Sequence, residues 1–171
     1  FLGILSFLES VIVPIPPDIF LLPIVLGKKN KWFYFGLYCT FFSILGGILG
    51  YLIGFLFWDV VGNTIISFYE AQNKISLLQE QFSKYGWFII IIAGFTPIPY
   101  KVFTIGSGLL GFNFFIFLVC SIFSRGLRFI TLAYLVSKYG ERSLKIVDKY
   151  FFSLSLILVF ILIIIFIMFY I

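Results

Sequence analysis

The chain has no histidine, and its only two cysteines, Cys39 and Cys120, lie far apart in apolar stretches. Without histidine, the common zinc sites and the Ser-His or Cys-His nucleophile pairs have no candidate residues. The cysteines lack Cys-x-x-Cys spacing, which favours packing over a disulfide or a metal site. The carboxylates are scattered singly along the chain. We therefore expect no metal and no cofactor, and we predict that the protein is not an enzyme.

Charge is also scarce, because only 11% of the residues are charged while 62% are hydrophobic. A soluble surface normally needs about 25–35% charged residues. The mean hydropathy of +1.16 predicts an all-α integral membrane protein, since its long apolar segments lack the alternation of barrel strands. The net charge of +5 gives no reason to propose nucleic acid as a partner. Because Phe1 replaces the expected methionine, we expect a piece of a longer protein.

Two proline-broken apolar segments repeat one pattern. Val-Pro-Ile-Pro-Pro-Asp-Ile-Phe at 13–20 returns as Thr-Pro-Ile-Pro-Tyr-Lys-Val-Phe at 96–103, and Asp18 corresponds to Lys101. Broken membrane helices expose helix ends and backbone groups that can hold a substrate, as in transporters. The breaks are predicted at Pro14, Pro16, Pro17, Pro97 and Pro99.

The distribution of Lys and Arg predicts the topology. If 86–110 crossed the membrane fully, the basic loops 28–31 and 138–149 would lie on opposite sides, against the positive-inside rule. We therefore predict that 86–110 is a re-entrant hairpin and that 1–27 is its inverted repeat, entering from the other side. Both basic loops would then face the cytoplasm in a multi-pass inner-membrane protein.

The remaining segments complete a single membrane domain over 1–171. Periodic apolar residues predict an interfacial amphipathic helix at 63–85. Three segments are long and apolar enough to span the membrane: 32–58, 113–137 and 151–171.

Gly46, Gly50 and Gly54 recur at intervals of four within 32–58. Such small-residue faces let another helix backbone approach closely. We expect packing here, either within the chain or in a homo-oligomer.

Charged residues within the apolar stretches are the main functional candidates, because each costs about 2.5–3.5 kcal/mol in a membrane. Glu9 could pair with Arg125 or Arg128 as a structural ion pair. A substrate or proton role is also open, since two guanidiniums exceed what one carboxylate needs. Asp18 could instead cap the half-helix that follows Pro17.

Lys101 follows the second proline break, where the amides at a helix start attract anions. Thr96 and Tyr100 could add hydroxyl donors for a bound group, or could hydrogen-bond to the broken backbone. Lys101 itself could instead extend to the membrane surface.

Several motifs together resemble the DedA family, also called the VTT or SNARE-associated family, and its YqaA-like bacterial branch. They are Glu9 with the Pro-Ile-Pro-Pro-Asp run, Gly-Tyr-Leu-Ile-Gly at 50–54, Gly-Phe-Thr-Pro-Ile-Pro-Tyr-Lys at 94–101 and Ser-Arg-Gly-Leu-Arg at 124–128. The resemblance implies a fold with two opposed re-entrant hairpins. It also implies transfer of lipids between leaflets, including polyprenyl phosphate and phosphatidylethanolamine, with proton-motive force implicated in bacteria.

The resemblance also assigns residues. Glu9 and Asp18 match the family's acidic pair, and Arg125 and Arg128 match its later arginine pair. Many members carry arginines on both sides of the second hairpin's proline, where this chain has Gly94 and Tyr100. At most one ammonium, that of Lys101, therefore replaces two guanidiniums at this place.

These observations predict a translocase or scramblase for a phosphate-bearing membrane lipid. Lys101, Arg125, Arg128, Thr96 and Tyr100 would bind the headgroup, while Glu9 and Asp18 would exchange protons. Two alternatives stay open: a proton-coupled exchanger of small ions or solutes, and a non-transporting membrane scaffold whose ion pairs only hold the hairpins together.

Overall fold

The computed structural model of the chain describes residues 1–11, 16–58, 72–95 and 99–140. Within these ranges the chain forms helices and no strand, which confirms the all-α prediction for them. The helices are α1 (Leu2–Val11), α2 (Asp18–Gly27), the 3-10 turn η1 (Lys29–Lys31), α3 (Trp32–Phe57), α5 (Gln72–Phe95), α6 (Tyr100–Leu109) and α7 (Phe114–Tyr139).

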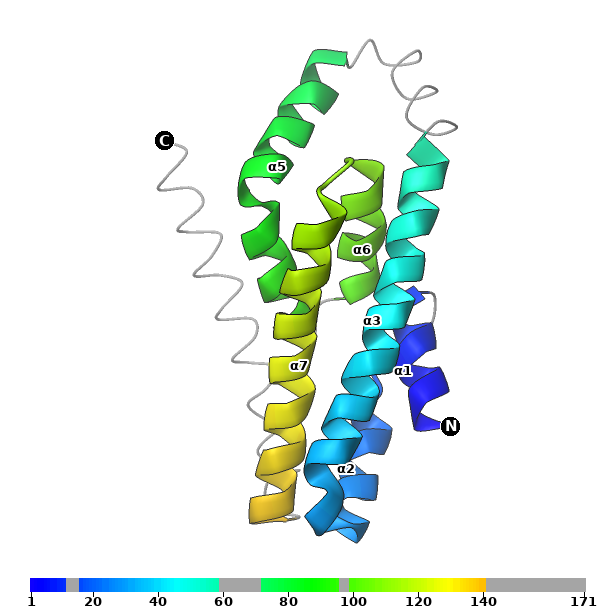
Figure 1. The fold of residues 1–171 in the computed structure, drawn as a ribbon, viewed down its shortest axis with the longest axis vertical. Coiled ribbons are helices and arrows are strands. Elements are labelled where there is room, and N and C mark those ends of the chain that lie inside the picture. The colour runs from blue at the N-terminus through cyan, green and yellow to red at the C-terminus, as the bar shows by residue number, and fades with distance from the viewer. Residues whose placement is uncertain (12–15, 59–71, 96–98, 141–171) are drawn as a thin grey trace.

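Two long helices, α3 and α7, run side by side through most of the height of the described part of the molecule (Figure 1). Each has 26 residues, which at 1.5 Å per residue gives a length of about 39 Å. A membrane core is about 30 Å thick, so both helices are long and apolar enough to cross it. The third expected spanning segment, 151–171, lies outside the described residues.

The shorter helices form two hairpins beside this pair. In Figure 1 the chain rises through α1 and descends through α2 in the lower half, and it descends through α5 and rises through α6 in the upper half. The segments 12–15 and 96–98, which hold Pro14, Thr96 and Pro97, lie outside the described residues. That the hairpins are re-entrant in a membrane stays a prediction.

The sequence predicted that an amphipathic helix ends at residue 85 and that the second hairpin begins at residue 86. Helix α5 is instead continuous from Gln72 to Phe95. Gly86 does not end the helix: a glycine costs a helix only about 1 kcal/mol, and this one lies in close contact with the ring of Phe112. Of the predicted amphipathic helix, residues 63–71 lie outside the described residues. Leu78, on its expected apolar face, is exposed.

Apolar residues form two separate clusters, one in each half of the molecule. The lower cluster joins α1, α2, α3 and α7. The upper cluster joins α3, α5, α7 and Phe112, which lies in the turn before α7. Their buried members are Leu2, Leu21, Leu22, Val25, Cys39, Phe129, Leu132, Ala133 and Val136 below, and Tyr51, Ile90, Phe112, Phe117 and Cys120 above. The two cysteines thus lie in different clusters, which keeps their thiols apart.

The glycines of α3 bring two other helices into backbone contact with it. A methyl carbon built on Gly46 would lie 2.4 Å from the carbonyl oxygen of Phe7 in α1. One built on Gly54 would lie 2.0 Å from the carbonyl oxygen of Ile105 in α6, and Gly50 also faces α6. The small-residue stripe therefore packs against helices of the same chain.

Candidate functional site

A layer of polar side chains separates the two apolar clusters near the middle of α3 and α7. Helices α1, α3, α6 and α7 supply its buried members, and α2 adds Asp18, which is 15% exposed. Its buried polar members are Ser6, Ser10, Thr40, Ser43, Thr104, Ser107, Ser121, Ser124, Arg125 and Arg128. Buried polar groups are tolerated best when they are hydrogen-bonded, and most of those in this layer have partners on neighbouring helices.

Arg125 is at the centre of the layer. Its side chain is only 1% exposed, and it forms an ion pair with Glu9 of α1, which is 13% exposed. The guanidinium Nε also donates a hydrogen bond to Ser43 Oγ of α3 at 2.7 Å. Ser43 Oγ in turn lies 2.8 Å from Ser10 Oγ of α1. One arginine therefore connects α7 with both α1 and α3.

Two aromatic rings cover the Arg125 guanidinium. Its central carbon lies 4.8 Å from the centroid of the Tyr100 ring in α6 and 4.7 Å from that of Phe129. Such cation–π contacts hold a guanidinium without neutralising it. The Tyr100 hydroxyl donates to Ser121 Oγ at 2.5 Å, so the ring is fixed in place. Tyr100 thus joins the second hairpin to the same arginine that Glu9 joins to the first.

A second ion pair connects Arg128 of α7 with Asp18, the first residue of α2. Both side chains are largely buried. The residue before the helix, Pro17, makes no side-chain capping bond, and the Asp18 carboxylate points to Arg128 instead of capping its own helix. Its place in the first turn is still favourable for an anion. The other carboxylate oxygen, Oδ1, is buried and accepts no hydrogen bond from the described residues.

The charges therefore pair one to one across the described part of the chain, Glu9 with Arg125 and Asp18 with Arg128. This differs from the sequence-based argument, in which two guanidiniums faced one carboxylate. Asp18 supplies the second negative charge because α2 begins beside α7, as the packing of these two helices shows. These four residues therefore leave the layer with no surplus positive charge.

The other predicted site residues lie partly around this layer. Lys101 is half-buried in the first turn of α6, next to Tyr100, and its carbonyl accepts a hydrogen bond from Thr104. Thr96 lies outside the described residues, as do Pro14 and Pro97. Of the remaining prolines, Pro16 is exposed, Pro17 precedes α2 and Pro99 precedes α6. The structure thus brings four of the charged candidates together and places Lys101 beside Tyr100.

The serines of the layer were missed by the sequence-based reasoning. Ser10 and Ser43 contact each other and support Arg125, and Ser6 donates a hydrogen bond to the Cys39 carbonyl at 2.7 Å. A signal was present, because small hydroxyl residues recur at helical spacing within apolar helices. The serines at 6 and 10, and those at 121 and 124 followed by Arg125, form such stripes.

The sequence profile of the VTT domain matches residues 13–138, which hold three of the four paired charges. The chain belongs to the VTT-domain (DedA) family. This confirms the resemblance drawn from the proline, glycine and arginine motifs.

Two relatives of this VTT-domain protein are described as uncharacterised. One, from Haemophilus influenzae, is 37% identical over 141 residues that cover 82% of this chain and 73% of the relative. Another, from Histophilus somni, is 30% identical with the same coverage. No solved structure matches the chain.

Family membership and composition together give the general class. VTT-domain proteins are linked to membrane transport, and no catalytic family is indicated. Two helices of this member are apolar and long enough to cross a membrane. The protein is therefore a helical membrane protein of a transporter-type family.

Proposed function

We propose that this protein moves a phosphate-bearing lipid, such as polyprenyl phosphate or a phospholipid, across the membrane through the polar layer. The observation that carries the proposal is the presence of two buried carboxylate–arginine pairs between the first hairpin and α7. A buried ion pair stabilises a fold little more than apolar packing of the same size would. Two such pairs at membrane depth therefore support a functional role.

The arginines could exchange one anion for another. A guanidinium holds a carboxylate or a phosphate through the same N–H donors, often two at once. Arg125 would keep its position during the exchange, because Ser43 and the rings of Tyr100 and Phe129 hold it independently of Glu9. A headgroup phosphate would thus take the place of Glu9 on Arg125 or of Asp18 on Arg128.

Protons would control this exchange. A protonated Glu9 or Asp18 no longer neutralises its arginine, which then attracts the lipid phosphate. Loss of the proton restores the carboxylate, which competes for the arginine and releases the headgroup. Asp18 has a buried oxygen without a hydrogen bond from the described residues, which could carry such a proton.

Lys101, Tyr100 and Thr96 belong to the proposal as the contribution of the second hairpin. Lys101 and Tyr100 begin α6, where the amides of a helix start favour an anion. In this arrangement the basic segments 28–31 and 138–149 face the cytoplasm of an inner membrane. One chain would supply the residues that bind the headgroup. A homo-oligomer would form through the lipid-facing surfaces of its copies.

The test is headgroup translocation in liposomes that contain the purified full-length protein. Polyprenyl phosphate and phosphatidylethanolamine are compared, each with and without a pH gradient. We expect protein-dependent flipping of a phosphate lipid that responds to the gradient and falls in Lys101→Ala. Gradient-independent flipping of both lipids would indicate a scramblase. Flipping no faster than in empty liposomes would contradict the proposal, and uptake of a small ion under the same gradient would favour the exchanger.

A scaffold without transport is the second candidate, and the one-to-one pairing favours it. Ion pairs that only hold hairpins in place should be fully matched, as these are. The double variant Glu9→Gln/Arg125→Gln removes one matched pair without leaving a charge behind. A scaffold should keep its cellular function with this change, whereas a transporter should fold and lose flipping.

The crossed double variant Glu9→Gln/Arg128→Gln is the control. It makes the same kinds of substitution but leaves Arg125 and Asp18 buried without their partners. Both candidates predict that this variant loses stability, because an uncompensated buried charge costs several kcal/mol. Equal stability of the matched and crossed variants would show that the pairs do not form.

A further inference from the structure

The turn between α2 and α3 forms a basic pocket at the lower end of the molecule. Five exposed residues line an open surface pocket of about 320 Å³: Gly27, Lys28, Lys29, Asn30 and Lys31. Three of these five residues carry a positive charge, and none carries a negative one. The pocket is separate from the polar layer. Helix α2 begins at the polar layer with Asp18 and ends at the pocket with Gly27, and a helix of ten residues is about 15 Å long.

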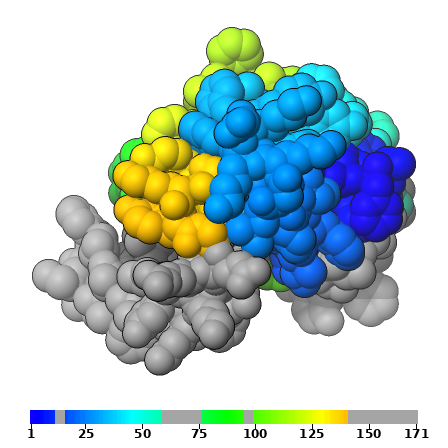
Figure 2. Space-filling view, turned by 90° about the horizontal axis from the view of Figure 1, so that it is seen from below, coloured from blue at the N-terminus to red at the C-terminus, as the bar shows by residue number. Residues whose placement is uncertain are grey.

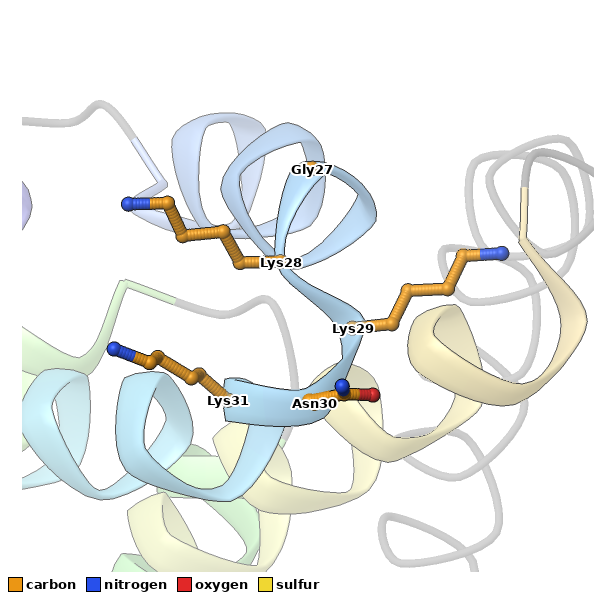
Figure 3. Close-up of a pocket in the computed structure, with 5 residues that line it drawn as sticks. All are labelled: Gly27, Lys28, Lys29, Asn30 and Lys31. Carbon is orange, nitrogen blue, oxygen red and sulfur yellow. The ribbon is translucent and has the colours of Figure 1, made fainter.

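Figure 3 shows how the lysines are arranged. Lys28 and Lys31 extend in the same direction, with their ammonium groups on one side of the turn, while Lys29 extends the opposite way toward the end of α7. The turn holds this geometry, since the Lys31 amide donates to the Lys28 carbonyl at 2.9 Å. Two parallel ammonium groups beside a small cavity fit an anion with several acceptor oxygens.

The surroundings place the pocket at the level of lipid headgroups. Trp32 follows the turn and packs edge-to-face on Tyr134 of α7, with ring centroids 5.2 Å apart. Tyr139 lies at the same end of α7, and tryptophan and tyrosine are enriched where a membrane meets water. Seen from below in Figure 2, the end of α7 lies directly beside the segment that joins α2 to α3.

One structural role explains part of this charge. Lysines near the end of α2 balance the partial negative charge of its last carbonyls. The Lys28 amide already hydrogen-bonds to the carbonyls of Ile24 and Val25, however, so the helix end has backbone partners. This role does not need two lysine side chains that extend in the same direction from the turn (Figure 3).

We propose that this basic pocket binds a phosphate group, and that the phosphate belongs to the headgroup of an anionic lipid in the adjoining leaflet. Lys28 and Lys31 would bind the phosphate oxygens, and Asn30 would add a hydrogen bond. The aromatic residues at the same end favour a lipid over a free phosphate ion, because they position the turn at the membrane surface. The proposal does not rest on lipid translocation, since the pocket and the ion-paired layer lie at opposite ends of α2.

The experiment is a binding titration with the detergent-solubilised full-length protein. Short-chain phosphatidylglycerol, short-chain phosphatidylcholine and inorganic phosphate are added to wild type and to Lys28→Gln/Lys29→Gln/Lys31→Gln. Each lysine near an anionic surface is worth about a fivefold change in affinity, and two lysines, Lys28 and Lys31, would bind the phosphate. Phosphatidylglycerol should therefore bind the triple variant about 25-fold more weakly. Phosphatidylcholine should bind both proteins equally.

Lys84→Gln is the matched control, because Lys84 is an exposed lysine on α5 and its loss should leave binding unchanged. A second control, Asp18→Asn/Arg128→Gln, tests whether phosphatidylglycerol is bound by the polar layer instead. Lysine-dependent binding of the lipid supports the proposal, and lysine-dependent binding of inorganic phosphate alone supports the phosphate site but assigns it to a free ion. Equal affinity of wild type and the triple variant for both would overturn it.

Discussion

The two hairpins contact the long helices in different ways. In the second hairpin, α6 lies against the backbone of α3, where a methyl carbon built on Gly108 would meet the carbonyl oxygen of Tyr51 at 2.0 Å. In the first hairpin, α2 meets α7 through larger side chains, including Leu22 and Val25 of the lower apolar cluster, and through the Asp18–Arg128 pair.

The difference shows which contact a change of charge can release. Backbones held together through glycine separate only if the whole interface moves, because no side chain can swing away. An ion pair loses its attraction when one proton is added to its carboxylate. Helix α1 of the first hairpin also packs closely against a glycine of α3, Gly46. We therefore infer that α2 is the element whose contact with α7 depends on charge, while α1 and α6 stay on α3.

The largest expected effect comes from breaking that contact. Asp18→Asn leaves Arg128 buried without its carboxylate, and we expect a loss of about 3–5 kcal/mol in the free energy of unfolding. Denaturant unfolding of the purified protein in detergent measures it. The double variant Asp18→Asn/Arg128→Gln should regain most of this loss. If the single variant is as stable as the double one, α2 does not depend on the pair.

The glycine contact should respond to size instead of charge. Gly54→Ala places a methyl group against the Ile105 carbonyl, and we expect a destabilisation of about 3 kcal/mol, near the upper end for overpacking. Thermal unfolding measures the change. Gly106→Ala is the matched control on α6, because its methyl group would meet nothing within 4 Å and should raise stability slightly. Equal effects at both glycines would disprove the close fit of α6.

Ser43→Ala tests the bridge between α1 and α7. The substitution removes the hydroxyl that accepts from Arg125 Nε and contacts Ser10. A buried donor left without a partner costs about 1–3 kcal/mol, so we expect a loss of about 2 kcal/mol in unfolding free energy. Ser137→Ala, which removes an exposed hydroxyl bond to the Tyr134 carbonyl, should change stability far less. A similar loss in both would show that Ser43 adds nothing specific.

The smallest effect is expected at the start of α7, where a helix cap takes no part in the hairpin contacts described above. The Asn113 side chain accepts from the amides of Phe115 at 2.9 Å and Ile116 at 3.1 Å. Asn113→Ala should therefore cost about 1 kcal/mol in unfolding free energy. Asn113→Asp keeps the cap and should retain stability. These two Asn113 variants show how much stability depends on a helix cap outside the hairpin contacts. A larger loss in Asn113→Ala than in Gly54→Ala would contradict the expected order of effects.

Much of this arrangement could be predicted from the sequence. The long apolar segments predicted α3 and α7, and the repeated prolines predicted that short helices begin near Asp18 and Lys101. The cost of charge in a membrane identified Glu9, Asp18, Arg125 and Arg128 as candidates, and a pair between Glu9 and one of the arginines was among the expected alternatives. These features are local, so composition and spacing are enough to find them.

The pairing itself could not be predicted. Arg125 and Arg128 lie on one face of α7, and either could reach Glu9 until the position of α2 beside α7 is known. The continuity of α5 through Gly86 was not predicted either, and Gly86 packs against a residue distant in sequence, Phe112. Such outcomes are decided by tertiary packing, which overrides local propensity.

The most direct test of this account is lipid flipping by Asp18→Asn/Arg128→Gln in liposomes, measured beside wild type at equal amounts of folded protein. The double variant keeps α2 free of unpaired charge, so its fold should persist. We expect flipping of the phosphate lipid to fall well below the wild-type rate, because the Asp18–Arg128 contact that joins α2 to α7 is no longer there to be exchanged for the headgroup. Flipping at the wild-type rate would contradict the account and leave the pair a structural link.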